Sequence, residues 1–279
     1  MRVVLTAVLL FASLSSTAPL SAQQSTPAPV TSDPRAIALI QRALAALVGR
    51  ATVSDVTLTG TAQRIAGSDD ETGTATLTAM SVGNSKLSLS FPSAVSSEIR
   101  NSAGTPLSET STTQGPQPVG AWSGPDGVLH AMAEHNLMTD ASWFFPAFTI
   151  NDVSASQSFA LSYIGQETHN GLSALHVSAL QTFPGFTQVP LLLSHLTQME
   201  LYLDPASYMP VALDFNVHPD NNANLDIPVE IRFSGYQPVN GVQVPFHVQK
   251  YLNNGLVLDL QFNNAVLNSG LTAASFQIQ

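Results

Sequence analysis

The sequence predicts an α+β domain in which one N-terminal helix precedes a long series of antiparallel β-strands. Three observations carry this prediction. Apolar and polar residues alternate in segment after segment, which is the period of a strand with one buried face. Turn signals recur at intervals that suit hairpins, not strands alternating with helices. One segment near the N-terminus has apolar residues at helical spacing instead.

The first 22 residues have the composition of a cleaved secretory signal. Arg2 precedes an apolar run over 3–14, and small residues follow up to Ala22. The run is shorter than the roughly 20 residues of a membrane-spanning helix, so we expect no transmembrane segment and a protein exported to a periplasm or beyond the cell. Residues 23–32 have the composition of a flexible linker, and 33–279 are expected to form a single domain.

Charge and cysteine content exclude several classes of protein. Removing Arg2 with the leader from nine basic residues leaves eight against 19 acidic ones, a formal charge of −11. Nucleic acid is therefore not an expected partner, because phosphate backbones require a concentrated basic patch. The absence of cysteine excludes both disulfides and a lipid anchor on a cysteine at the cleavage site.

The first element is expected over 33–49. Asp33 is a suitable N-cap, Pro34 suits the first helical turn and Gly49 suits the C-terminal end. The apolar positions between them predict an amphipathic helix and are Ile37, Ile40, Leu44, Leu47 and Val48.

Strands with antiparallel neighbours are expected next, over 53–65, 72–80 and 85–91. Residues 101–118 are rich in Ser, Thr, Gly and Pro, which predicts an exposed loop. A helix is expected from about 128 to 139.

The densest aromatic cluster of the chain, 143–148, follows that predicted helix. Two interpretations of Trp143 and Phe144 remain open. Their rings either fill the core, which aromatic side chains dominate by area, or line the mouth of a ligand site.

The second half of the chain predicts consecutive hairpins. Segments 159–165 and 172–180 flank Asn170-Gly171, a strong turn signal, and another pair flanks Asn240-Gly241. Further hairpins are expected around 204–207 and 253–255. The alternation is strongest in the last strands, at Ile227, Val229, Ile231 and Phe233, at Val242, Val244, Phe246 and Val248, and at Leu256, Leu258, Leu260 and Phe262.

The chain carries no known catalytic, phosphate-binding or dinucleotide-binding signature, so no catalytic residue and no cofactor are expected. His130 and His135 would fall on different faces of the predicted helix. No metal pair is therefore expected there. Four other histidines have no carboxylate at a ligand spacing in the sequence and are expected to be structural or exposed: His169, His176, His195 and His247.

The segment 218–226 comes nearest to a metal site, because its oxygen-bearing side chains alternate as in a calcium loop. Leu225 and Ile231, however, stand where such a loop needs Gly and Glu, so a polar turn and no metal are expected. Four strand or turn carboxylates could in principle pair for acid–base chemistry but are expected on a solvated face: Glu200, Asp204, Asp214 and Glu230.

Several segments together carry a family resemblance. They are VSDVTLTG at 53–60, YIGQETHNG at 163–171 with LHV at 175–177, LYLDPASYMPV at 201–211 and SGYQPVNGVQVP at 234–245. With the leading helix, they resemble the LolA/LolB superfamily of lipoprotein-sorting carriers over most of 34–279. The long 101–118 segment departs from the best-known carriers.

The resemblance implies a strongly curved, incompletely closed antiparallel sheet, a half-barrel, with helices covering its concave face and an apolar interior that takes up acyl chains. The expected function is a non-enzymatic carrier or binding protein for lipid, lipoprotein or another amphiphile. Envelope proteins are possible further partners. The residues expected to line the apolar cavity are Leu58, Leu89, Phe91, Met132, Trp143, Phe144, Met199, Leu201, Leu213 and Phe215.

Two other functions stay open. One is a structural or interaction domain of the cell envelope with a fully packed core and no ligand. The other is a hydrolase with an unrecognised site, which would need a base within hydrogen-bond reach of a nucleophile.

Overall fold

The computed structural model describes residues 31–104, 117–155, 158–183 and 191–278. The predicted leader and most of the predicted linker lie outside the described residues. None of the described helices has both the length and the apolar character that crossing a membrane requires.

In the described part of the chain, thirteen strands form one sheet, and every pair of neighbouring strands is antiparallel. The order across the sheet is β6-β5-β4-β3-β2-β1-β13-β12-β11-β10-β9-β8-β7. The strands are β1 (Asp55–Ala66), β2 (Asp69–Met80), β3 (Asn84–Ser90), β4 (Val95–Gly104), β5 (Gln117–Ser123), β6 (Leu129–Ala131), β7 (Phe159–His169), β8 (Leu172–Gln181), β9 (Met199–Leu203), β10 (Pro210–Val217), β11 (Ile227–Val239), β12 (Val242–Leu252) and β13 (Gly255–Leu267).

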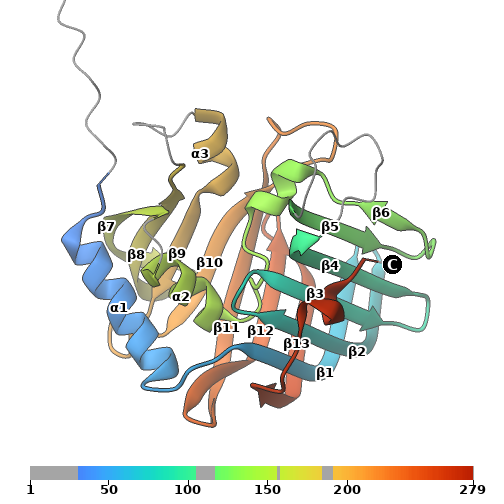
Figure 1. The fold of residues 1–279 in the computed structure, drawn as a ribbon, viewed down its shortest axis with the longest axis horizontal. Helices are drawn as coiled ribbons and strands as arrows, with labels where there is room; N and C mark the ends of the chain where they lie inside the picture. Colours follow the sequence, from blue (N-terminus) through green and yellow to red (C-terminus); the bar gives the residue numbers. More distant parts are fainter. Residues whose placement is uncertain (1–30, 105–116, 156–157, 184–190, 279) are drawn as a thin grey trace, which may run out of the picture.

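The sheet curves around its own helices without closing, because its edge strands β6 and β7 do not pair with each other (Figure 1). Helices α1 (Pro34–Val48) and α2 (Pro146–Ala155) pack against each other, and their buried residues join the inward-facing strand residues in one hydrophobic core. The remaining helices are short: α3 (Leu191–Thr197), η1 (Glu134–Met138) and η2 (Ala273–Phe276). The predicted half-barrel with helices on its concave face is therefore confirmed.

Helix α1 begins and ends where the sequence predicts. The Asp33 side chain accepts a hydrogen bond from the Arg35 backbone N–H at 2.8 Å, Pro34 is the first helical residue and Gly49 closes the helix with a positive φ of 57°. The buried face differs in part from the predicted one, because Ile37 is 39% exposed. The small side chains of Ala36 and Ala43 are part of the buried face, together with Leu39, Ile40 and Leu47.

The alternating segments form strands as predicted, and the Asn-containing turns explain their short connections. Asn170 and Gly171 both have positive φ, 51° and 78°, and Asn240 and Gly241 repeat this with 50° and 84°. Two consecutive positive φ angles match the twist of the flanking strands, and Asn and Gly adopt them at the lowest cost.

Two predictions in the first half are wrong. The segment from 128 to 139 is no α-helix: it supplies the short strand β6 and the 3₁₀ helix η1. Pairing with β5 draws it into the sheet, since His130 lies opposite Trp122 and their rings stack at 4.3 Å. The predicted loop 101–118 also begins too early, because β4 continues to Gly104, and Asn101 is buried. The part over 105–116 lies outside the described residues.

Candidate functional site

A pocket of about 920 Å³ opens between the two ends of the sheet, on the side where the half-barrel is not closed. Strands β4 and β5 and helix η1 line one side, while α2 and the strands β7 to β9 line the other. Its apolar lining residues are Pro118, Val119, Leu137, Met138, Ala141, Val153, Ala155, Phe159, Phe183 and Met199.

Arg100 is the basic residue of the pocket lining and is 7% exposed. Its Nε lies 2.9 Å from Glu98 Oε1, while its Nη1 donates to the carbonyl oxygens of Asn136 and Thr139, both at 3.2 Å. Burial alone would raise the pKa of Glu98, but the charges of Arg100 and Lys250 hold it below its ordinary value. Glu98 thus neutralises Arg100, which also fixes η1 against β4.

Two carboxylates, Asp140 and Asp152, also line the pocket. Asp140 Oδ1 accepts hydrogen bonds from the backbone N–H and the hydroxyl of Ser142, at 2.8 and 2.9 Å, and its Oδ2 accepts one from Thr149. Asp152 lies on α2 beside it, and burial followed by the charge of Asp140 raises the pKa of Asp152 to about 6. The pocket therefore combines an apolar wall with a carboxyl group that titrates near neutral pH.

Of the ten residues expected to line an apolar cavity, Met199 lines this pocket. Met132 is half-buried, with its sulfur close to Gly120 of β5. Met199 is also buried in the hydrophobic core, as are the other eight: Leu58, Leu89, Phe91, Trp143, Phe144, Leu201, Leu213 and Phe215. Phe215 also borders a second pocket on the sheet, of about 580 Å³.

The concave hollow is thus largely filled by the protein's own side chains. The Trp143 and Phe144 rings meet edge to face at 5.6 Å and are 2% and 1% exposed. The Lys250 Nζ lies 4.7 Å from the Trp143 ring centroid, a favourable cation–π distance. The pocket described above lies next to this packed core. Sequence reasoning missed most of its lining because those residues come from elements far apart in the chain: β4, β5 and η1 on one side, α2 and the strands β7 to β9 on the other.

A polar network lies on the other face of the sheet, across β9 to β11. Glu200 and Glu230 are both register partners of Asp214, so three carboxylates stand side by side on neighbouring strands. These carboxylates lie on the face away from the core, as expected, but they are only partly solvated: the side chains of Glu230 and Asp214 are 13% and 30% exposed. Like charges opposite each other destabilise a sheet unless other groups compensate.

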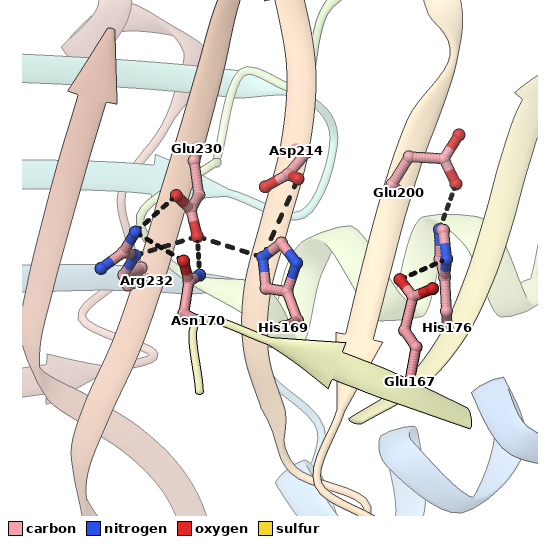
Figure 2. A network of polar contacts seen from close by, with 8 residues as sticks. All are labelled: Glu167, His169, Asn170, His176, Glu200, Asp214, Glu230 and Arg232. Carbon is pink, nitrogen blue, oxygen red and sulfur yellow. Dashed lines mark hydrogen bonds and ion pairs between the residues drawn. The ribbon is translucent and has the colours of Figure 1, made fainter. Parts of the chain in front are cut away.

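The tip of the β7–β8 hairpin supplies that compensation by crossing over this face, as Figure 2 shows. His169 Nε2 lies 3.1 Å from Glu230 Oε1, and Asn170 donates to the same oxygen. The ring of His169 stacks on Tyr202 with centroids 3.6 Å apart. Arg232 completes the network by donating to both oxygens of Glu230, at 2.8 and 2.9 Å.

The second half of the network joins the hairpin to β9. His176 Nε2 lies 2.7 Å from Glu200 Oε2, and its Nδ1 lies 3.0 Å from Glu167 Oε1 (Figure 2). Asp214 remains the least compensated carboxyl group. Burial, and then the charges of Glu230 and Glu200, raise the pKa of Asp214 to about 7.

Four histidines lack carboxylate neighbours along the sequence but have them in the fold. In the fold His169 and His176 contact the carboxylates just described, His195 Nδ1 lies 3.0 Å from Asp226 and His247 Nε2 lies 3.1 Å from Asp259. The partners come from other strands or turns, which spacing along the chain does not reveal.

His130 and His135 are separate in the fold, for a reason other than the predicted helix. His130 Nε2 lies 3.0 Å from Asp126 Oδ2, whereas His135 Nε2 donates to the Pro219 carbonyl at 3.1 Å. The segment 218–226 forms the polar turn that the sequence predicts, between β10 and β11.

One hydrogen-bonded chain has the composition of a hydrolytic triad. The Ser234 hydroxyl lies 3.0 Å from His247 Nδ1, and His247 Nε2 lies 3.1 Å from both oxygens of Asp259. Ser234 is exposed on β11, and none of the three residues lines either pocket described above. Gln249 and Gln261 also donate to Asp259, which is typical of a polar strand surface.

No family model matches the chain, and no curated protein matches its sequence. Solved structures are similar in fold. A DUF1329 family protein from Desulfovibrio piger has a TM-score of 0.51 and 12% identity, with 90% of this chain and 98% of that chain covered. A LolA superfamily protein from Nitrosomonas europaea has a TM-score of 0.50 and 9% identity, with 87% of this chain and 97% of that chain covered. At these identities the likeness establishes architecture alone. The chain has a LolA/LolB-like fold.

Proposed function

We propose that the protein is an exported, non-enzymatic binding or carrier protein for a lipid or another amphiphile. The pocket at the open side of the half-barrel carries this proposal, because it places an apolar wall beside buried polar groups. Its volume, about 920 Å³, lies near the upper end of the roughly 300–1,000 Å³ range of small-molecule sites.

The chemistry of the pocket suits a molecule with an apolar tail and a polar end. Val119, Val153 and Phe159 offer surface to a tail, and each methylene removed from water contributes about 0.8 kcal/mol. Met138 and Met199 add side chains that adapt to different shapes. The LolA/LolB-like fold supports the same role, since the sequence resemblance implies uptake of acyl chains. A bacterial periplasm is the location that the N-terminal leader pattern favours.

The packed core favours a second candidate, an envelope interaction domain without a ligand. Nine of the ten residues expected to contact a ligand belong to the hydrophobic core. Under this alternative the pocket would stay filled with water.

The two candidates differ in what the purified protein carries. Native mass spectrometry of the gently purified chain should show a bound lipid, and a fluorescent fatty acid should bind with a stoichiometry of one. Replacing Ala141, a half-buried pocket residue, by Trp should lower that affinity. Losing the burial of two methylenes costs about 1.6 kcal/mol, which weakens binding about tenfold.

The matched control is Ala206→Trp, at an exposed position of the β9–β10 turn. It adds the same ring without entering the pocket, so fatty-acid affinity should stay at the wild-type value. Equal affinities for the two variants would remove the pocket as the binding site. Absence of both co-purified lipid and fatty-acid binding would favour the interaction domain.

A further inference from the structure

Two histidines and an aspartate converge where α3 meets the turn between β10 and β11. His195 comes from the last turn of α3, His218 directly follows β10 and Asp226 directly precedes β11. His195 Nδ1 and His218 Nε2 each lie 3.0 Å from the same oxygen, Asp226 Oδ1. All three atoms lie within 4.8 Å of one another.

The hydrogen bond on the far side of His195 fixes what its ring presents to Asp226. His195 Nε2 lies 2.9 Å from the carbonyl oxygen of Ala223, which can only accept, so Nε2 carries a proton. A neutral His195 therefore directs the lone pair of Nδ1 at a carboxylate oxygen. Two acceptors at 3.0 Å repel each other unless a proton or a cation lies at this point.

His218 is held in place firmly and is withdrawn from solvent. Its side chain is 0% exposed. Asn136 of η1 fixes its backbone from both sides: the Asn136 amide donates to the His218 carbonyl at 2.7 Å and accepts from the His218 N–H at 2.9 Å.

We propose that His195, His218 and Asp226 bind a divalent transition-metal ion of the Zn²⁺ class through two imidazole nitrogens and one carboxylate oxygen. Imidazole and carboxylate are the donors that Zn²⁺ takes beside thiolate, and a tetrahedral ion with ligands at about 2.0–2.2 Å needs ligand atoms slightly more than 3 Å apart. The backbone carbonyl on His195 is the outer partner that a metal-bound histidine commonly has. Asp226 is 44% exposed, which leaves room for water at a fourth position.

A second group of similar composition serves as an internal comparison. The ligand atoms of His169, Asp214 and Glu230 also lie within 4.8 Å of one another. There the guanidinium of Arg232 already neutralises Glu230 through two hydrogen bonds. Among the described residues, the ion-pair partners of Asp226 are His195 and His218, and neither is an arginine or a lysine. The first group is therefore the one that a cation would complete.

The test is Zn²⁺ titration of the tag-free, chelator-treated full chain by calorimetry, with Co²⁺ as a spectroscopic substitute. We expect one Zn²⁺ per chain and the strong visible absorption of tetrahedral Co²⁺. His195→Gln and Asp226→Asn change partly exposed side chains, so both should fold, as circular dichroism would verify. Each should weaken Zn²⁺ binding by more than about 100-fold, since loss of an outer partner alone costs about 10–100-fold.

The matched control is Asp126→Asn, which alters another aspartate with a histidine at 3.0 Å but with no second histidine beside it. It should bind Zn²⁺ as the wild type does. The proposal is overturned if the wild type takes up no Zn²⁺, or if the folded His195→Gln and Asp226→Asn variants bind it unchanged. Loss of binding in Asp214→Asn, with Asp226→Asn unaffected, would also overturn it by moving the ion to the other group.

Discussion

Replacing Asp214 by Asn should change how the stability of the protein depends on pH. Asp214 stands between Glu200 and Glu230, with Arg232, His169 and the Tyr202 hydroxyl as its other polar neighbours. Its pKa is about 7 in the folded protein against an ordinary value of 3.8. A carboxyl group with a raised pKa destabilises the folded state once it ionises, so this contribution is smallest below the ordinary pKa.

The magnitude follows from the size of that shift. About three pKa units at 1.36 kcal/mol each set an upper limit of about 4 kcal/mol. The side chain is 30% exposed, and solvent screening lowers the expected effect to about 2 kcal/mol. The wild type should lose this stability as the pH rises from about 4 to about 7, with no further loss above. Asp214→Asn has no charge to acquire and should not lose it.

The assay is urea unfolding of both proteins across this pH range, compared as the difference between their unfolding free energies. That difference should grow by about 2 kcal/mol in favour of Asp214→Asn between about pH 4 and about pH 8. Asp204→Asn should leave this difference nearly constant over the same range, because hydrogen bonds from the backbone and side chain of Ser207 lower the pKa of Asp204 and so stabilise the fold throughout it. That contribution to stability exists above the ordinary pKa and is lost at lower pH. Parallel curves for wild type and Asp214→Asn would refute the reasoning.

Three further predictions concern the pocket, the core and the triad-like chain. An alkyl sulfonate, whose charge is constant, should bind more weakly above about pH 6 than below it, because Asp152 then ionises in the pocket wall. Asp152→Asn should bind the sulfonate equally well on both sides of this pH, and a pH dependence that persists in the variant would assign the effect to another group. Leu213→Asp should fail to fold, because Leu213 is 1% exposed in the core and a carboxylate there would be buried without a partner. Near-UV circular dichroism measures this, and a folded variant would contradict the tight packing of Leu213. Ser234→Ala should leave hydrolysis of p-nitrophenyl acetate at the wild-type rate, and a loss of activity would establish a catalytic Ser234.

The sequence determined the strand-rich second half and helix α1 because their signals are local. Alternation at Val229 and Ile231 places one face of a strand in the core whatever the neighbouring strand is, and Asn170-Gly171 adopts its turn through its own backbone preferences. Asp33 caps α1 through a hydrogen bond two residues along the chain. Such signals do not depend on distant contacts, and the prediction from them was confirmed.

The tertiary structure alone decided where polar groups meet and where space remains. Asp214 has two carboxylate neighbours only because β10 lies between β9 and β11 in one register, and His195 meets Asp226 only because α3 packs beside the β10–β11 turn. Alternation also did not decide whether Leu213 contacts a ligand or the core. It predicts which face of a strand is buried, but not what covers that face. The pocket and the polar clusters arise from contacts between segments far apart in the chain, and local periodicity carries no information about those contacts.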